Sequence, residues 1–130
     1  MASIRKEILI DAPPEEVWAA VRDFGAIHRR LTPGVVVDVR LDGDTRVVTF
    51  ANGLVAREPL VDLDDEARRL AYAAVGGRAT HYNASMQVFA AEEGRSRLVW
   101  IIDLLPHELA GPVRAIAEHA LRVAKQTLER

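Results

Sequence analysis

The side chains that could perform chemistry are few, and the histidines come first among them. They are His28, His81, His107 and His119. No two of them have the HxxxH or HExxH spacing of a helical metal site, and no carboxylate is placed to complete such a motif. Cysteine is absent, which excludes a thiolate metal site and a cysteine nucleophile. The sequence therefore predicts no metal site and no cofactor.

Other catalytic motifs are also missing from the chain. It contains no GxSxG elbow and no phosphate-binding loop. Gly76-Gly77 is better explained as a turn that needs a positive φ angle. His81 follows this turn, where it could donate a hydrogen bond to a ligand carbonyl or lie exposed in a loop.

Composition and charge limit the kinds of partner. The chain has 17 basic and 19 acidic residues and a net charge of -2, so it lacks the basic surface typical of nucleic-acid binding. No apolar run approaches the length of a membrane span, and the N-terminus has no apolar signal region. We expect a cytoplasmic protein that is a monomer or homodimer, without nucleic acid and without stable membrane insertion.

These residues must be positioned by one domain, because 130 residues suit a single core. Hydrophobic periodicity changes along the chain and divides it into segments. The expected order is a strand (3–11), a helix opening at Pro13-Pro14 and closing at Gly25, a short helical piece (26–31), six strands (35–41, 46–51, 55–63, 69–75, 82–91 and 97–105) and a long helix (112–129).

The short loops between the last six strands predict an antiparallel meander, and the helices then make an α+β fold. Seven strands must curl, and we expect the sheet to curve around the long C-terminal helix. The apolar stripe of that helix is rich in alanine at Ala117, Ala120 and Ala124. Either the helix packs closely on the sheet, or the small side chains leave a cavity there.

The strand from Tyr82 to Phe89 is ambiguous in its alternation. One parity turns Tyr82, Ala84, Met86 and Val88 inward, and the other turns Asn83, Ser85, Gln87 and Phe89 inward. A count of hydrophobic residues favours the first set. A ligand cavity needs a few convergent polar groups, which favours the second. A slip of one residue exchanges the two faces.

Three segments carry a resemblance to a known family. They are residues 10–18 (IDAPPEEVW), 62–70 (DLDDEARRL) and 99–106 (VWIIDLLP). In this order they resemble the START/Bet v 1-like (helix-grip) superfamily, and within it the bacterial polyketide cyclase/dehydrase-like proteins. The resemblance covers almost the whole chain. It implies a seven-stranded sheet wrapped around the last helix, with a deep apolar cavity between them that takes lipids, polyketides or aromatic compounds.

The resemblance also suggests which residues meet a ligand. It implies an inward acidic group at Glu58, a cavity aromatic at Tyr72, and Asn83 and Ser85 toward the cavity. Glu58 could equally be a solvated charge on its strand. The candidate ligand-binding residues are Val48, Phe50, Glu58, Leu60, Tyr72, His81, Asn83, Ser85, Trp100, Ile116, Ala120 and Ala124.

The loops Asn52-Gly53-Leu54 and Val75-Gly76-Gly77 resemble those that gate the cavity in plant abscisic-acid receptors. Val55 stands where those receptors have a proline, so the resemblance to a plant-type gate is partial.

Three functions remain open. The chain could bind a small hydrophobic ligand as a carrier or sensor. It could be a cyclase or dehydratase in which Glu58 or His81 is the acid or base and Tyr72 or Asn83 polarises an oxygen. It could also be an interaction module with exposed apolar loops around Ile27 and Leu54.

Overall fold

The computed structural model describes residues 2–130, so Met1 of the expected domain lies outside the described residues. The elements follow the predicted order, with two short 3₁₀ turns, η1 (Glu92–Gly94) and η2 (His107–Leu109), in addition. They are β1 (Ala2–Ile10), α1 (Pro14–Arg22), α2 (Ile27–Arg30), β2 (Val36–Asp42), β3 (Thr45–Phe50), β4 (Val55–Asp64), β5 (Arg69–Ala73), β6 (His81–Ala90), β7 (Ser96–Leu105) and α3 (Ala110–Leu128).

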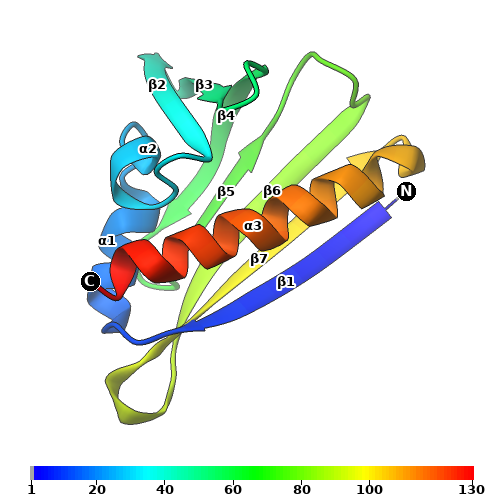
Figure 1. The fold of residues 1–130 in the computed structure, drawn as a ribbon. Helices are drawn as coiled ribbons and strands as arrows, with labels where there is room; N and C mark the ends of the chain where they lie inside the picture. Colours follow the sequence, from blue (N-terminus) through cyan, green and yellow to red (C-terminus); the bar gives the residue numbers. More distant parts are fainter. Residues whose placement is uncertain (1) are drawn as a thin grey trace.

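All seven strands form one antiparallel sheet in the order β1-β7-β6-β5-β4-β3-β2. The strands β2 to β7 make the predicted meander, and β1 joins it beside β7 (Figure 1). The predicted turns are where the glycines require them, because Gly53 has a φ angle of 89° and Gly76 one of 81°.

The sheet is curved, and α3 crosses its concave side (Figure 1). Two strands carry one extra residue each, between Val36 and Asp38 in β2 and between Leu60 and Asp62 in β4. The extra residue shifts the pairing register and bends the strand. The helices α1 and α2 lie at the end of the sheet where α3 finishes. The predicted α+β arrangement is confirmed.

Polar contacts hold α3 against β1. The Lys6 ammonium lies 2.9 Å from the Glu118 carboxylate, and Lys125 donates to the carbonyl of Leu9 at 3.0 Å. The face of α3 turned to the sheet is buried at Ala117 and Ala124. Small side chains thus line the face of α3 that is turned to the sheet.

The helix α1 begins at Pro14, as the double proline predicts, and buries Val17 and Val21. Its Trp18 indole donates to Asp65 at 2.8 Å, and Arg22 donates to the same carboxylate. These bonds fix α1 to the turn between β4 and β5. None of the helices in residues 2–130 is both long enough and apolar enough to cross a membrane.

Candidate functional site

The alternation of β6 decides which side chains face the concave side of the sheet. Ala84, Met86 and Val88 belong to the core, and Tyr82 packs against it. Their neighbours across the sheet agree, because Ala84 lies between Tyr72 and the equally buried Ile102. The inward set is therefore the apolar one.

Asn83 and Ser85 consequently lie on the opposite face of β6 from the core. The interpretation that turned these two polar residues toward a cavity was wrong. Turning an amide and a hydroxyl into an apolar core without partners would cost free energy, whereas the alternative buries apolar side chains.

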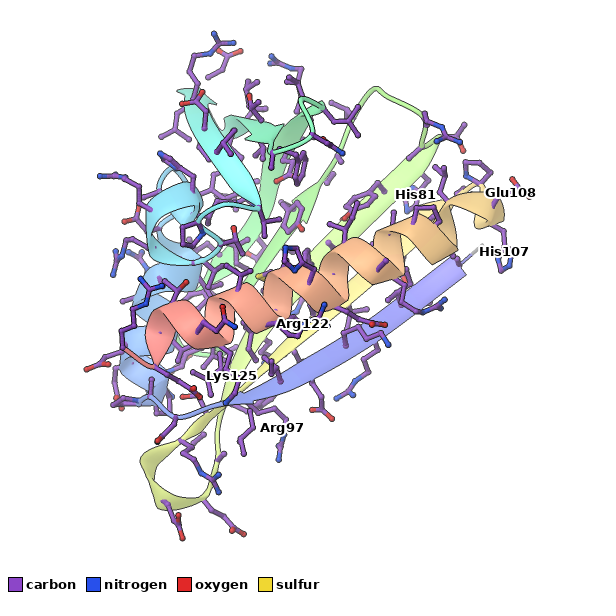
Figure 2. The ribbon with its side chains drawn as sticks, in the orientation of Figure 1. His81, Arg97, His107, Glu108, Arg122 and Lys125 are labelled. Atoms are coloured by element: carbon purple, nitrogen blue, oxygen red, sulfur yellow. The ribbon has the colours of Figure 1, made fainter. Side chains whose placement is uncertain are left out.

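His81 does not reach the concave side either. It is exposed at the start of β6, has the parity of Asn83, and pairs with Leu105 just before α3 begins. Figure 2 shows it at that end of the sheet. The arrangement in which His81 or Asn83 works together with Glu58 and Tyr72 is therefore absent, because the groups lie on opposite faces.

Glu58 is buried and turned inward, and it is paired with a residue that the sequence analysis missed. The Arg46 guanidinium donates from Nε to Glu58 Oε1 at 2.7 Å, and the two residues are direct neighbours on β3 and β4. Only 5% of the Arg46 side chain and 8% of the Glu58 side chain are exposed. A buried ion pair of this kind adds little stability by itself. Buried charged groups often lie at functional sites, so the pair marks a candidate site.

Aromatic rings surround the arginine. Its guanidinium carbon lies 4.1 Å from the centroid of the Phe24 ring and 4.8 Å from that of Tyr72. The ring of Tyr82 lies beside that of Tyr72, with 6.5 Å between the two centroids. Cation–π attraction and ring packing thus fix the Arg46 side chain in place.

Burial sets the protonation of this cluster. It raises the pKa of the Glu58 carboxyl, and the charge and hydrogen bond of Arg46 oppose that rise. Burial also raises the pKa of both Tyr72 and Tyr82 above the ordinary value of 10.0. Both phenols are therefore protonated at neutral pH and can donate a hydrogen bond.

One donor in this region has no partner. The indole Nε1 of Trp100 is buried and makes no hydrogen bond. Trp100 stands on β7 between Lys6 and Met86 with its side chain on the core side of the sheet. The Tyr72 phenol lies near it, because burial raises the pKa of Tyr72 and a side-chain interaction with the Trp100 indole opposes that rise.

The remaining predicted residues divide into a buried and a partly exposed group. Val48 on β3 and Ala120 and Ala124 on α3 are buried. The partly exposed inward side chains are Phe50, Leu60 and Trp100, and Tyr82, which was not among the predicted residues, resembles them. These side chains pack against the core on the concave side of the sheet.

Ile116 is 43% exposed on α3. At 100° per residue it lies on the flank of α3 opposite Glu118 and Lys125, which contact β1. This flank adjoins Ala120 and is turned toward the rest of the concave side. An exposed isoleucine thus lies on the flank of α3 that is turned away from β1.

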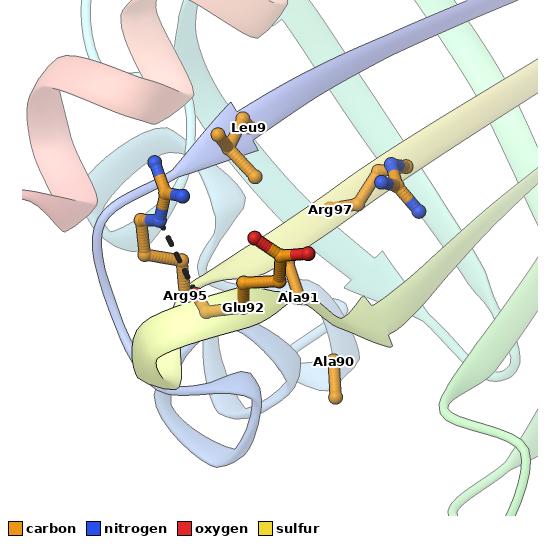
Figure 3. A pocket seen from close by; sticks show the side chains of 6 residues that line it. All are labelled: Leu9, Ala90, Ala91, Glu92, Arg95 and Arg97. Carbon is orange, nitrogen blue, oxygen red and sulfur yellow. Dashed lines mark hydrogen bonds between the residues drawn. The ribbon is translucent and has the colours of Figure 1, made fainter.

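Two surface hollows of the described residues lie away from the Arg46–Glu58 pair. The larger, of about 570 Å³, is at the turn between β6 and β7 (Figure 3). Its arginines are already engaged, because Arg95 donates to the Glu92 carbonyl and Arg97 lies 3.3 Å from Glu7. The smaller hollow lies between β1 and α3. Neither is lined by a predicted ligand-binding residue.

Two further expectations concern metals and surface loops. Residues 2–130 contain no group of three or more histidine, aspartate or glutamate side chains that could hold a metal ion. Ile27 is buried and Leu54 is 64% exposed, so the two do not form the joint apolar surface that an interaction module would use.

Comparison with known proteins places the chain among relatives. Residues 1–130 match the family model described as polyketide cyclase / dehydrase and lipid transport. The chain belongs to this family. The resemblance seen in the sequence is thereby confirmed, including its helix-grip fold.

Several solved structures share the fold of this chain. An uncharacterized protein of Bacillus thuringiensis is 20% identical, with 98% of each chain covered and a TM-score of 0.88. A Thermobifida fusca protein is 27% identical over 99% of this chain and 91% of its own, with a TM-score of 0.80. The di-domain ARO/CYC BexL from the BE-7585A biosynthetic pathway is 20% identical over 99% of this chain and 47% of its own, with a TM-score of 0.83.

Proposed function

We propose that this protein binds a small, largely apolar molecule on the concave side of its sheet, as a carrier or sensor. The observation that carries the proposal is the set of inward aromatic side chains that stay partly exposed around the buried Arg46–Glu58 pair. Membership of a family described by polyketide and lipid chemistry supports it.

The geometry favours binding over acid–base catalysis. Glu58 Oε1 is engaged by Arg46, and the nearby phenols of Tyr72 and Tyr82 hold their protons because burial raises their pKa. A general base needs a free acceptor atom and a pKa of its own near the working pH. His81, the other candidate, lies on the opposite parity of β6.

Exchange of one exposed residue of α3 tests the proposal. Ile116→Glu places a charge on the flank of α3 turned away from β1, and Ala115→Glu places the same charge on an exposed neighbouring residue of the helix. Titration with a fluorescent naphthalene probe measures the affinity of each variant. Replacing an apolar contact to the probe with a charge should raise the Kd at least about tenfold.

Ala115→Glu should bind the probe like the unchanged protein. Equal affinity of all three proteins would show that the probe does not bind on the concave side, and the proposal would be wrong. Native mass spectrometry of the freshly purified protein then looks for a molecule retained from the cell.

A further inference from the structure

We propose that this protein forms a two-fold dimer in which β2 pairs antiparallel with β2 of a second copy of the chain. The two curved sheets then join edge to edge, with the two-fold axis at Val39. This interface lies at the edge of the sheet, so it goes beyond the proposed ligand binding and does not depend on it.

The sheet has one covered edge and one open edge. At β1, Lys125 of α3 donates to the Leu9 carbonyl and Glu118 of α3 contacts Lys6, so the last helix lies along this edge. Beyond β2, no further strand of residues 2–130 follows, and five of the seven residues of β2 are exposed (Figure 1). An open edge presents a row of backbone N–H and C=O groups that can pair with another strand.

The hairpin between β2 and β3 determines which backbone groups of β2 face outward. Asp42 and Thr45 flank a two-residue turn and stand opposite each other, so they form a hydrogen-bonded pair. Because bonded and non-bonded pairs alternate along an antiparallel ladder, Val39 and Leu41 turn their N–H and C=O groups away from β3. Two copies of Val39 can therefore exchange two hydrogen bonds across a two-fold axis.

The charges on the outer face of β2 match across this axis. Val39 packs against the core, so its neighbours Asp38 and Arg40 lie on the opposite face, where both are exposed. A two-fold axis at Val39 places Asp38 of each copy directly opposite Arg40 of the other. Neither side chain takes part in an ion pair within residues 2–130, so the dimer gains two ion pairs without breaking any.

Neighbouring registers of the two strands are less favourable. An axis at Asp38 or at Arg40 would set two copies of the same charge opposite each other, which is destabilising. An axis at Leu41 would set Arg40 opposite Asp42. The Asp42 carboxylate already lies 2.9 Å from Arg57 of its own chain. The charge pattern thus selects a single register.

The same register covers exposed apolar side chains. Val37 is 52% exposed and Leu41 is 57% exposed, and each lies two residues from Val39. They therefore stand opposite each other in the paired strands, where contact removes their apolar surface from water. The bulge at Val37 limits the pairing to residues 37–41. Because so short a contact is smaller than a standard interface, we expect a dissociation constant in the micromolar range.

Charge reversal at the two exposed positions tests this pairing. Sedimentation velocity measures the mass of the particle at protein concentrations up to about 1 mM. The unchanged protein should pass from monomer to dimer as the concentration rises. Asp38→Arg and Arg40→Asp should each stay monomeric, because each variant sets like charges opposite one another twice. An equal mixture of the two variants should form a heterodimer, since every opposed pair then carries opposite charges.

Asp62→Arg is the matched control, because it reverses an exposed carboxylate on β4, which has strands on both sides, and should dimerise like the unchanged protein. Circular dichroism checks that every variant is folded. Nuclear magnetic resonance needs no substitution, because the Val39 amide should become protected from hydrogen exchange as the concentration rises. A protein that stays monomeric at about 1 mM would overturn the proposal. A dimer that persists in both charge-reversed variants, or a mixture of them that stays monomeric, would do the same.

Discussion

At the scale of single residues, the contact between Arg46 and Glu58 is the most informative. Both are charged, both are buried, and each satisfies the other at 2.7 Å. The pair links β3 to β4, and Arg46 Nη1 also reaches the carbonyl of Phe24 at 3.4 Å. The pair therefore holds Phe24, at the end of α1, against the concave side of the sheet.

Removing one partner should be worse than removing both. Arg46→Met leaves the Glu58 carboxylate buried without a counter-charge and should lower the free energy of unfolding by about 3–5 kcal/mol. The double variant Arg46→Met with Glu58→Leu should recover most of this loss, because apolar side chains of similar size replace the whole pair. Urea unfolding measures both. An additive result would show that the pair is not coupled.

At the scale of elements, the attachment of α1 depends on Asp65. This carboxylate accepts hydrogen bonds from Trp18 and Arg22 at 2.8 Å each, although it is exposed itself. The bond from Trp18, then that from Arg22, holds the pKa of Asp65 below its ordinary value of 3.8. A carboxyl group whose pKa is lowered in the folded state stabilises that state at pH values above its ordinary pKa.

Asp65→Ala should accordingly lower the melting temperature at neutral pH. The difference from the unchanged protein should shrink as the pH falls through the lowered pKa of Asp65, since the carboxylate is then protonated in both states. Thermal unfolding followed by circular dichroism at several pH values measures this. Asp62→Ala, an exposed carboxylate on β4, is the control. A difference that stays constant down to acid pH would contradict the expectation.

At the scale of the whole molecule, the spacing between α3 and the sheet depends on alanine. Ala117 is 1% exposed on the face of α3 that meets the core. Ala117→Leu adds volume where the helix already touches the sheet, and should cost about 1–3 kcal/mol in the free energy of unfolding. Ala115→Leu, exposed on the same helix, should change stability little. Urea unfolding compares the two.

A neutral or stabilising effect of Ala117→Leu would mean that space remains under this part of α3. The ligand would then have room beneath the helix as well as beside it. The expected loss of stability would instead show that no such space exists beneath Ala117. A ligand would then be limited to the exposed part of the concave side beside the helix, where Ile116 lies.

Much of the architecture follows from local signals in the sequence. The double proline begins α1, glycines with positive φ make the turns, and changes of hydrophobic period separate strands from helices. These signals act between residues close in the chain, so the order of elements needs no tertiary information. The helix α3 starts at Ala110, two residues before the expected Pro112, because the first turn of a helix accepts proline.

The register that pairs Arg46 with Glu58 differs from the one that the sequence signal implies. A two-residue turn at Asn52-Gly53 would place Val47 opposite Glu58. The hairpin is instead centred on Asn52, with Thr49 opposite Val55, and this longer loop brings Arg46 opposite Glu58.

Only the tertiary structure decided the face of β6. Tyr82 and Asn83 alternate in any strand, and although the count of hydrophobic residues favours the Tyr82 set, the sequence left both faces open. That choice depends on α3, which follows β6 by some twenty residues (110 − 90) and lies over one side of the sheet. Burial of the apolar set beneath this helix lowers the free energy more than burial of an amide and a hydroxyl would. The sequence alone thus determined the order of elements, and long-range packing determined which residues meet at the candidate site.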